Sequence, residues 1–473
     1  MRREEKACAA KGVRREMRGN DLGRDRIGPL VLKLAIPSML AQLVNVLYGV
    51  VDRIYISNIP EAGEQALAGI GVSGPISTLI TSFALLVGIG GAPLTAMRMG
   101  EGNQKGAEDI LANCTLMLLA LSAILTGFVL AFREQLLMAF GASEALMPYA
   151  EPYLRYLGMG TVFSMGALGL NQFIICQGYS TAGMMTVMIG AAANIALDPL
   201  FIFGLDMGCA GAAIATVLSQ MISFGFVVWF LLKKARVRIR LGGYSARIMK
   251  RVLTFGFSPF VIGATDSIVV IGLNSVLQRY GGAQGDSLIA AATITQSYMQ
   301  LITMPLGGLS GGTQPLLSFN FGARKVDRIR QGEKVIVMTG LIFTAAMFLI
   351  SQFAPGGFAR IFTSDEALIE TAAQAIRVYT MAIIPLTLQY CFVDGLTALG
   401  IAKVAMTLSV TRKGSMLLIT LLIPMGFGAF SAFWAEPIAD LMSSIISSIV
   451  FLRMFNPLMR RRMEMPEDAP LYG

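Results

Sequence analysis

Two aspartates and several amide and hydroxyl residues stand inside long apolar stretches of the sequence. Asp52 lies in the first such stretch and Asp198 in the fifth, where Asn194 precedes it by four residues. Residues four apart on a helix share one face, and the same spacing joins Thr216 to Gln220. Carboxylate, amide and hydroxyl oxygens suit a small hard cation, and two neighbouring carboxylates can share a proton. These residue types therefore indicate a site for a cation or a proton.

The chain consists of two copies of one unit, and one constant shift along the sequence aligns them without gaps. The shift matches prolines, glycines and charged residues, among them the pairs Pro37/Pro259, Gly90/Gly312, Glu144/Glu366, Arg155/Arg377 and Gly178/Gly400. Chance gives scattered Leu or Ala matches in an apolar chain, but not this set in register. Self-similarity of this kind indicates a duplicated architecture.

The polar set belongs to the first copy. Under the shift that carries Pro37 onto Pro259, Asn274 replaces Asp52 and Thr420 replaces Asp198, so the second copy holds neither carboxylate. Asn171, Asn194 and Thr216 give way to apolar residues, namely Val393, Met416 and Ile438. A purely architectural role should survive in both copies. We therefore predict one cation or proton site, formed by Asp52, Asn171, Asn194, Asp198 and Thr216.

The elements that must hold these residues are membrane-spanning helices. A spanning helix needs about 20 mostly apolar residues, and the chain has twelve such stretches: 30–56, 67–96, 108–132, 147–178, 183–204, 210–232, 253–278, 288–318, 335–353, 370–399, 405–424 and 430–455. Each copy contributes six, so both copies have the same orientation. The predicted fold is an all-α integral membrane protein with two parallel six-helix repeats.

Basic residues give the expected topology. They gather in the N-terminal tail and in alternate loops, including residues 233–251, whereas the opposite loops hold only Arg133, Arg279 and Arg360. The positive-inside rule then places both termini in the cytoplasm. The expected domains are a tail (1–27), a first lobe (28–232), a basic linker (233–252), a second lobe (253–456) and a C-terminal tail (457–473). We expect no nucleic-acid partner, because no binding motif accompanies these charges.

Composition excludes several classes of function. Of 473 residues, 55% are apolar and 14% charged, against about 25% charged in a soluble domain. The chain has no histidine, which removes His-based catalytic triads, zinc sites and haem ligation. The five cysteines show no CxxC spacing. We expect no enzyme activity, no cofactor and no metal other than an ion at the predicted cation site.

Five further residues are candidates for substrate contact or gating. Pro37 interrupts the hydrogen bonding of the first span, and Gln172 adjoins Asn171. Ionisable residues inside a membrane are costly and are functional hypotheses by default. On that ground the second copy contributes Asp266, Asp394 and Glu436. Negative charges in an apolar cavity would favour cationic, lipophilic molecules.

Several segments resemble signatures of the multidrug and toxic compound extrusion (MATE) family, in its MepA- and DinF-like bacterial branch. The segment from Asn194 to Gly204, continued by Gly211 to Gln220, resembles the signature of spans five and six. Residues 51–56 (VDRIYI) resemble the span-one signature, and residues 68–71 and 99–103 the start and end of span two. The resemblance covers essentially the whole chain.

The resemblance implies a V-shaped pair of lobes that exports organic cations or other toxic compounds in exchange for Na⁺ or H⁺. It maps the cation site onto the five residues that differ between the two copies. We expect a protein of the bacterial plasma (inner) membrane that functions as a monomer, since one chain already contains both lobes. Its partners would be small-molecule drugs or toxins and the lipid bilayer. The alternatives are a flippase for a lipid-linked substrate, a membrane enzyme and a channel. A flippase for pyrophosphate-linked lipids would need a cationic cavity, whereas the spans carry mainly acids.

Overall fold

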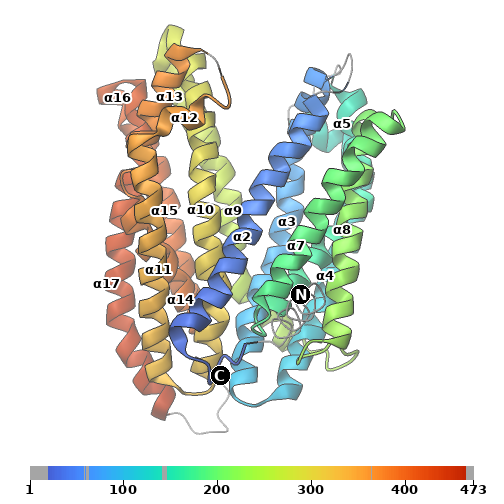
Figure 1. Cartoon of the computed structure of the whole chain (residues 1–473), viewed down its shortest axis with the longest axis vertical. Coiled ribbons are helices and arrows are strands. Elements are labelled where there is room, and N and C mark those ends of the chain that lie inside the picture. Colours follow the sequence, from blue (N-terminus) through green and yellow to red (C-terminus); the bar gives the residue numbers. More distant parts are fainter. Residues whose placement is uncertain (1–19, 58, 60–62, 141–145, 364, 465–473) are drawn as a thin grey trace, which may run out of the picture. The chain divides into compact units, whose positions relative to one another are not determined.

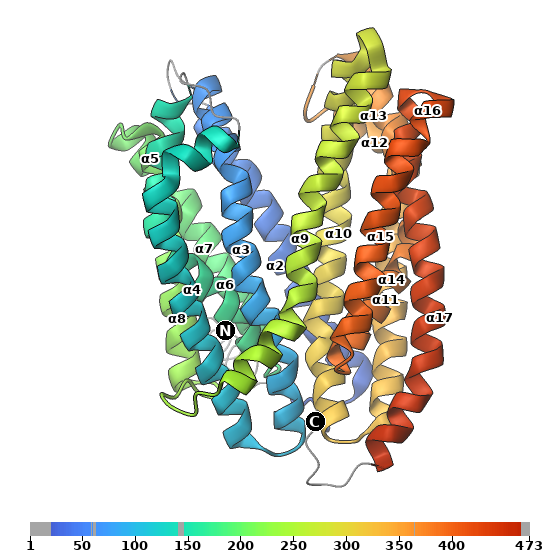
Figure 2. The same cartoon turned by 180° about the vertical axis from the view of Figure 1, so that it is seen from behind.

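The computed structural model describes residues 20–57, 59, 63–140, 146–363 and 365–464, and every regular element within them is a helix. The chain divides into two compact units, Met1–Phe260 and Val261–Gly473. The prediction of an all-α fold with two lobes is confirmed. Figures 1 and 2 show the long helices of each unit from opposite sides.

The first unit contains seven helical elements, one of them extended by a π-turn, and the beginning of a further helix. They are α2 (Ile27–Ser57), α3 (Gly63–Gly100), α4 (Gln104–Ala139), α5 (Met147–Met159), α6 (Thr161–Ile175), α7 (Ser180–Pro199) with the π-turn η1 (Leu200–Gly204), and α8 (Gly208–Lys233). Helix α9 (Ala246–Gly281) begins in this unit and ends in the second.

The second unit continues with α10 and ends with α17. Its long helices are α10 (Gly285–Gly322), α11 (Val326–Phe353), α13 (Glu366–Tyr379), α14 (Ile383–Ala398), α15 (Ala402–Leu422) and α17 (Ala435–Glu464). Short elements join them, namely η2 (Gly282–Gln284), α12 (Pro355–Ala359), α16 (Pro424–Phe427) and η3 (Ala429–Trp434). In both views α10, α11, α14, α15 and α17 run side by side along the unit (Figures 1 and 2).

Each of the twelve expected spans falls on one long helix or on one bent pair of helices. Among the described residues, eight helices are long and apolar enough to cross a membrane, and ten spans result if each bent pair counts as one. The remaining two, α9 and α10, have 36 and 38 residues, which is about 55 Å of helix each. Most helices extend beyond the apolar stretch that predicted them, because polar residues continue the helix at its ends.

The internal repeat is visible in the helix boundaries. The shift that aligns the two copies carries both ends of α3, Gly63 and Gly100, onto both ends of α10, Gly285 and Gly322. It likewise carries the first residues of α6 and α7 onto those of α14 and α15. Both units also contain one bent span, with angles of 55° between α5 and α6 and 51° between α13 and α14. Two copies of one sequence have therefore formed two copies of one helix arrangement.

Close helix contacts in the first unit depend on glycine. A Cβ added at Gly256 on α9 would lie 1.7 Å from the Leu86 oxygen on α3, and one added at Gly90 on α3 would lie 2.3 Å from the Val252 oxygen. Small residues at such crossings let two backbones approach closely. The first turns of α9 are therefore packed directly on α3.

Candidate functional site

The polar residues predicted to form a cation site lie on four helices of the first unit. Asp52 is on α2, Asn171 is on α6, Asn194 and Asp198 are on α7, and Thr216 is on α8. Asn194 and Asp198 are 1% and 0% exposed, and Thr216 is also buried. Burial of a carboxyl group among membrane-spanning helices is costly unless it is paired or neutralised.

Asn194 connects the two neighbouring helices α7 and α8. Its Nδ2 donates to Asp198 Oδ1 at 3.0 Å and approaches Thr216 Oγ1 at 3.5 Å. Among the described residues, Asn194 Oδ1 and Asp198 Oδ2 are buried and receive no hydrogen bond. The Asn194 amide thus uses its NH₂ group for its neighbours, and one oxygen each of Asn194 and Asp198 stays available for a ligand. Unsatisfied buried oxygens of this kind call for a ligand, water or ion.

The first helix brings a second carboxyl group to this place. Asp52 interacts electrostatically with Asp198, and both aspartates interact with the hydroxyl groups of Tyr48 and Tyr153. Tyr48 precedes Asp52 by one helical turn, so the two share a face of α2. The site therefore contains two carboxyl groups, the Asn194 amide and the Thr216 hydroxyl, and the hydroxyl groups of Tyr48 and Tyr153 interact electrostatically with its carboxyl groups.

Local backbone features position α7 against α8. The α-helical part of α7 ends at Pro199, and the chain continues through the wider turn η1. A Cβ at Gly211 on α8 would lie 2.5 Å from the Phe201 oxygen of that turn. Glycine at this position lets α8 approach η1 directly after Asp198, which brings Thr216 toward Asn194.

A cavity of about 350 Å³ lies beside the cluster, between α2, α3, α6, α7 and α8. Polar side chains form much of its wall, including Asn45, Tyr48, Thr81, Asn171, Thr186, Ser219, Gln220 and Ser223. Tyr48 belongs both to this wall and to the surroundings of the carboxyl groups. The cavity and the acidic pair are therefore adjacent through one side chain.

The structure separates Asn171 from the other four residues. Its Nδ2 donates to the Gly183 oxygen at 3.2 Å, near the first turn of α7. Asn194 lies about three turns further along the same helix, which is about 16 Å. The predicted five-residue cluster is thus a four-residue cluster, and Asn171 is a buried residue of the cavity wall. Its Oδ1 receives no hydrogen bond from the described residues.

The other candidates of the first unit lie away from the carboxyl pair. Pro37 is inside the continuous helix α2, about four turns or 22 Å from Asp52. Gln172 is half-buried, and its Cγ lies 3.0 Å from a Cβ built at Gly88 of α3. Asp266 belongs to the second unit, where it is on α9, and its side chain lies outside the described part of the structure.

The other two candidates of the second unit have different surroundings. Asp394 on α14 accepts a hydrogen bond of 2.5 Å from Ser310 of α10. Glu436 on α17 forms a buried ion pair of 3.0 Å with Arg412, which also contacts Asp440 at 2.6 Å. A charge already neutralised by an arginine is less available to a substrate than one that is not.

The structure accommodates Arg412, a basic residue inside the expected span 405–424, where a charge is costly. It lies in the middle of α15 and is 7% exposed. The reason is local: α17 supplies two carboxyl groups, Glu436 and Asp440, that share one helix face and neutralise it. The four-residue spacing of these acids was visible in the sequence, but their partner was not.

Sequence reasoning also missed Glu333 and the two tyrosines. Glu333 stands on α11 and is 6% exposed, just before the predicted start of that span at 335. The apolar stretch begins at 335, so the sequence predicts a loop at Glu333. Tyr48 was detectable from its spacing of four residues to Asp52. Tyr153 comes from a different helix, α5, and no sequence pattern linked it to the cluster.

Comparisons with known proteins give the family. The MatE family model matches residues 37–200 and 264–415. The chain is 22% identical over 427 residues to the multidrug export protein MepA of Staphylococcus aureus, covering 89% of this chain and 92% of that protein.

Solved structures share the fold. An outward-facing multidrug resistance MATE family transporter of the MOP superfamily is 23% identical, with a TM-score of 0.87 over 94% of this chain and 99% of that one. A MOP superfamily transporter from Pyrococcus furiosus is 22% identical, with a TM-score of 0.86 over 93% of this chain and 98% of that one. For the latter a different function has been suggested from the reversed polarity of its binding pocket.

Proposed function

Since the chain belongs to the MatE family of multi-pass membrane transporters, we propose that it is a secondary active multidrug exporter coupled to Na⁺ or H⁺. Its substrates are lipophilic organic cations. It acts in the bacterial plasma membrane with both termini in the cytoplasm, as the basic loops predict. The export activity named for the similar MepA proteins supports this function.

One observation carries the proposal: an acidic pair lies beside a polar cavity, and Asp198 and Asn194 each have an unsatisfied oxygen there. The Asp198 carboxyl and the Asn194 amide each keep an oxygen that accepts no hydrogen bond from the described residues. These oxygens, with Asp52 and Thr216, are hard ligands for Na⁺, and the carboxyl pair equally accepts a proton. The cavity beside them has room for part of an organic cation.

Competition couples the two fluxes. A cation drawn to the acidic pair loses affinity when Na⁺ or H⁺ neutralises that pair, because the attracting charge is gone. The coupling free energy equals the difference in drug affinity between the two states and acts equally on the ion. Tyr48 lines the cavity and interacts with the aspartates. A drug in the cavity therefore changes the binding of the ion at the aspartates, and the ion changes the binding of the drug.

Efflux of ethidium from proteoliposomes tests the proposal. Gradients of Na⁺ and of pH are imposed separately, and the wild type is compared with Asp52→Asn and Asp198→Asn. We expect one gradient to drive efflux in the wild type. Both variants should fall to the rate of protein-free liposomes, because an amide cannot exchange a proton and binds a cation less strongly.

The matched control is Asp206→Asn, which makes the same change in the same unit. Asp206 is exposed in the connection after η1 and has a positive φ of 51°, a conformation that asparagine tolerates. Its efflux should equal that of the wild type. Gradient-driven efflux that persists in both cluster variants would refute the site, and a wild type that moves no organic cation would refute the exporter.

A further inference from the structure

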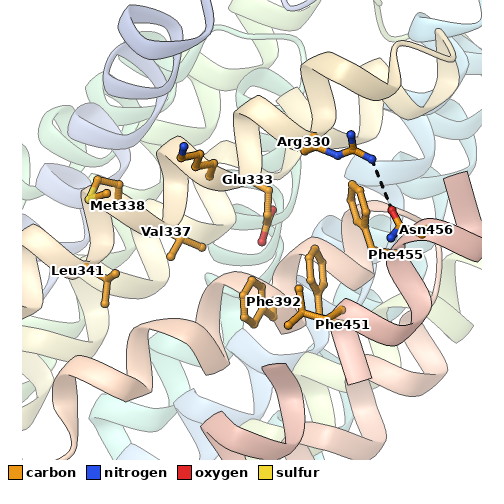
Figure 3. Close-up of a pocket in the computed structure, with 11 residues that line it drawn as sticks. Arg330, Glu333, Val337, Met338, Leu341, Phe392, Phe451, Phe455 and Asn456 are labelled. Carbon is orange, nitrogen blue, oxygen red and sulfur yellow. Dashed lines mark hydrogen bonds between the residues drawn. The ribbon is translucent and has the colours of Figure 1, made fainter. Parts of the chain in front are cut away.

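A second cavity, of about 470 Å³, lies within the second unit between α11, α14 and α17 (Figure 3). Its polar end is lined by Arg330, Lys334 and Asn456. Toward the middle of the helices the lining becomes apolar, with Val337 and Leu341 one and two turns beyond Lys334 on α11. The cavity therefore changes from basic to apolar along the helix axis, as a membrane lipid changes from head group to acyl chain.

The charges at the polar end are incompletely neutralised. Within the described part of the chain, Lys334 forms no ion pair, and the guanidinium of Arg330 donates a hydrogen bond of 3.4 Å to the Asn456 amide oxygen but forms no ion pair. Glu333 points into the cavity from α11 (Figure 3). Its Oε1 is buried and receives no hydrogen bond from any described residue. Asp394 lies near Glu333 and adds negative potential there.

The apolar wall is aromatic and reaches the surface of the unit. Phe392 of α14 stacks on Phe451 of α17 with ring centres 4.4 Å apart. Met338 and Leu452 border the cavity and are 53% and 66% exposed. Exposed apolar residues on spanning helices face lipid, so the cavity opens where acyl chains lie.

We propose that this cavity binds a phospholipid with a primary amine in its head group, phosphatidylethanolamine being the model ligand. Its phosphate lies between Lys334 and Arg330, its ammonium donates to Glu333, and one acyl chain lies on the stacked rings. Charge complementarity selects this occupant. An anionic lipid would place negative charge beside Glu333, and an organic cation would meet two basic side chains at the entrance.

Native mass spectrometry of the purified, delipidated full-length protein tests this site. Phosphatidylethanolamine and phosphatidylglycerol of identical acyl chains are titrated separately. A charge-assisted hydrogen bond to Glu333 should make the ethanolamine lipid bind about tenfold more tightly. Glu333→Gln should abolish that preference, whereas Asp327→Asn, an exposed acid on the same helix, should retain it.

The phosphate contact has its own variant. Lys334 is exposed, so Lys334→Gln should fold normally and weaken both phospholipids alike. The equally exposed Lys403 provides the control Lys403→Gln, which should change neither. Soluble glycerophosphoethanolamine should not compete, because most of the contact is with the acyl chain.

Four outcomes would overturn the assignment. The first is equal affinity of the wild type for the two lipids, and the second is a preference that survives in folded Glu333→Gln. The third is unchanged lipid affinity in Lys334→Gln. The fourth is displacement of the lipid by tetraphenylphosphonium at equal concentration. The last outcome would make the cavity an organic-cation site. None depends on whether the protein exports drugs, so this test and the efflux test fail independently.

Discussion

Three sets of buried acidic residues have three different environments. Asp198 has amide, hydroxyl and carboxyl neighbours. Glu333 borders a cavity with basic residues at its entrance. Glu436, with Asp440, is paired with Arg412. Of the three sets, only the last is in direct contact with a positively charged side chain within the described residues. The surroundings of a buried acid therefore distinguish a ligand site from a structural ion pair. The presence of the acid in a span does not.

We predict that Arg412→Met destabilises the second unit by about 3–5 kcal/mol, because it leaves two carboxyl groups buried without their counter-charge. The measurement is the temperature at which the detergent-purified protein loses its monodisperse elution. Arg412→Met combined with Glu436→Gln and Asp440→Asn should recover most of the loss, since it removes all three charges. A triple variant as unstable as the single one would show that packing of the guanidinium, and not charge, matters.

Helix positions followed from the sequence because the length of an apolar run fixes a span. What the sequence misjudged was the position of certain residues along their helices. Asn171 was grouped with Asp198 because the second copy lacks both polar residues, but spans joined by a short loop run in opposite directions. Residues near that loop are therefore far from residues at the other ends. Glu333 was misjudged because it stands two residues before the apolar run that predicts the span at 335–353.

The sequence also does not predict where two helices cross closely, because it does not show which glycine contacts the backbone of another helix. At Gly256 of α9 a methyl group would lie 1.7 Å from the Leu86 oxygen. We predict that Gly256→Ala lowers the melting temperature and the yield of folded protein, since α9 and α3 must move apart.

Gly127 on α4 provides the matched control for this crossing. A methyl group there would meet nothing within 4 Å. Gly127→Ala should leave the melting temperature unchanged or raise it, because alanine favours a helix over glycine by about 1 kcal/mol. Equal melting temperatures for the two variants would contradict the close contact between α9 and α3.

In the whole chain, the duplication explains why the helices of the two units correspond. The polar residues explain how the two units differ. The helix boundaries of α3, α6 and α7 recur in the second copy under one shift, yet the carboxyl pair occurs in one unit and the Arg412 ion pairs in the other. A shared fold therefore carries two different buried charge arrangements.

The orientation of the chain is the last prediction, and it follows from the basic loops. Tyr244, in the basic segment, and Phe427, at the end of α16, are 50% and 84% exposed. In a Cys8→Ala background, a membrane-impermeant maleimide should label Phe427→Cys in intact cells and Tyr244→Cys only after permeabilisation. Cys114, Cys176, Cys209 and Cys391 are buried, so they should contribute little. The reverse pattern would invert the topology and would turn the proposed export into uptake, because the same gradients would act on opposite faces of the protein.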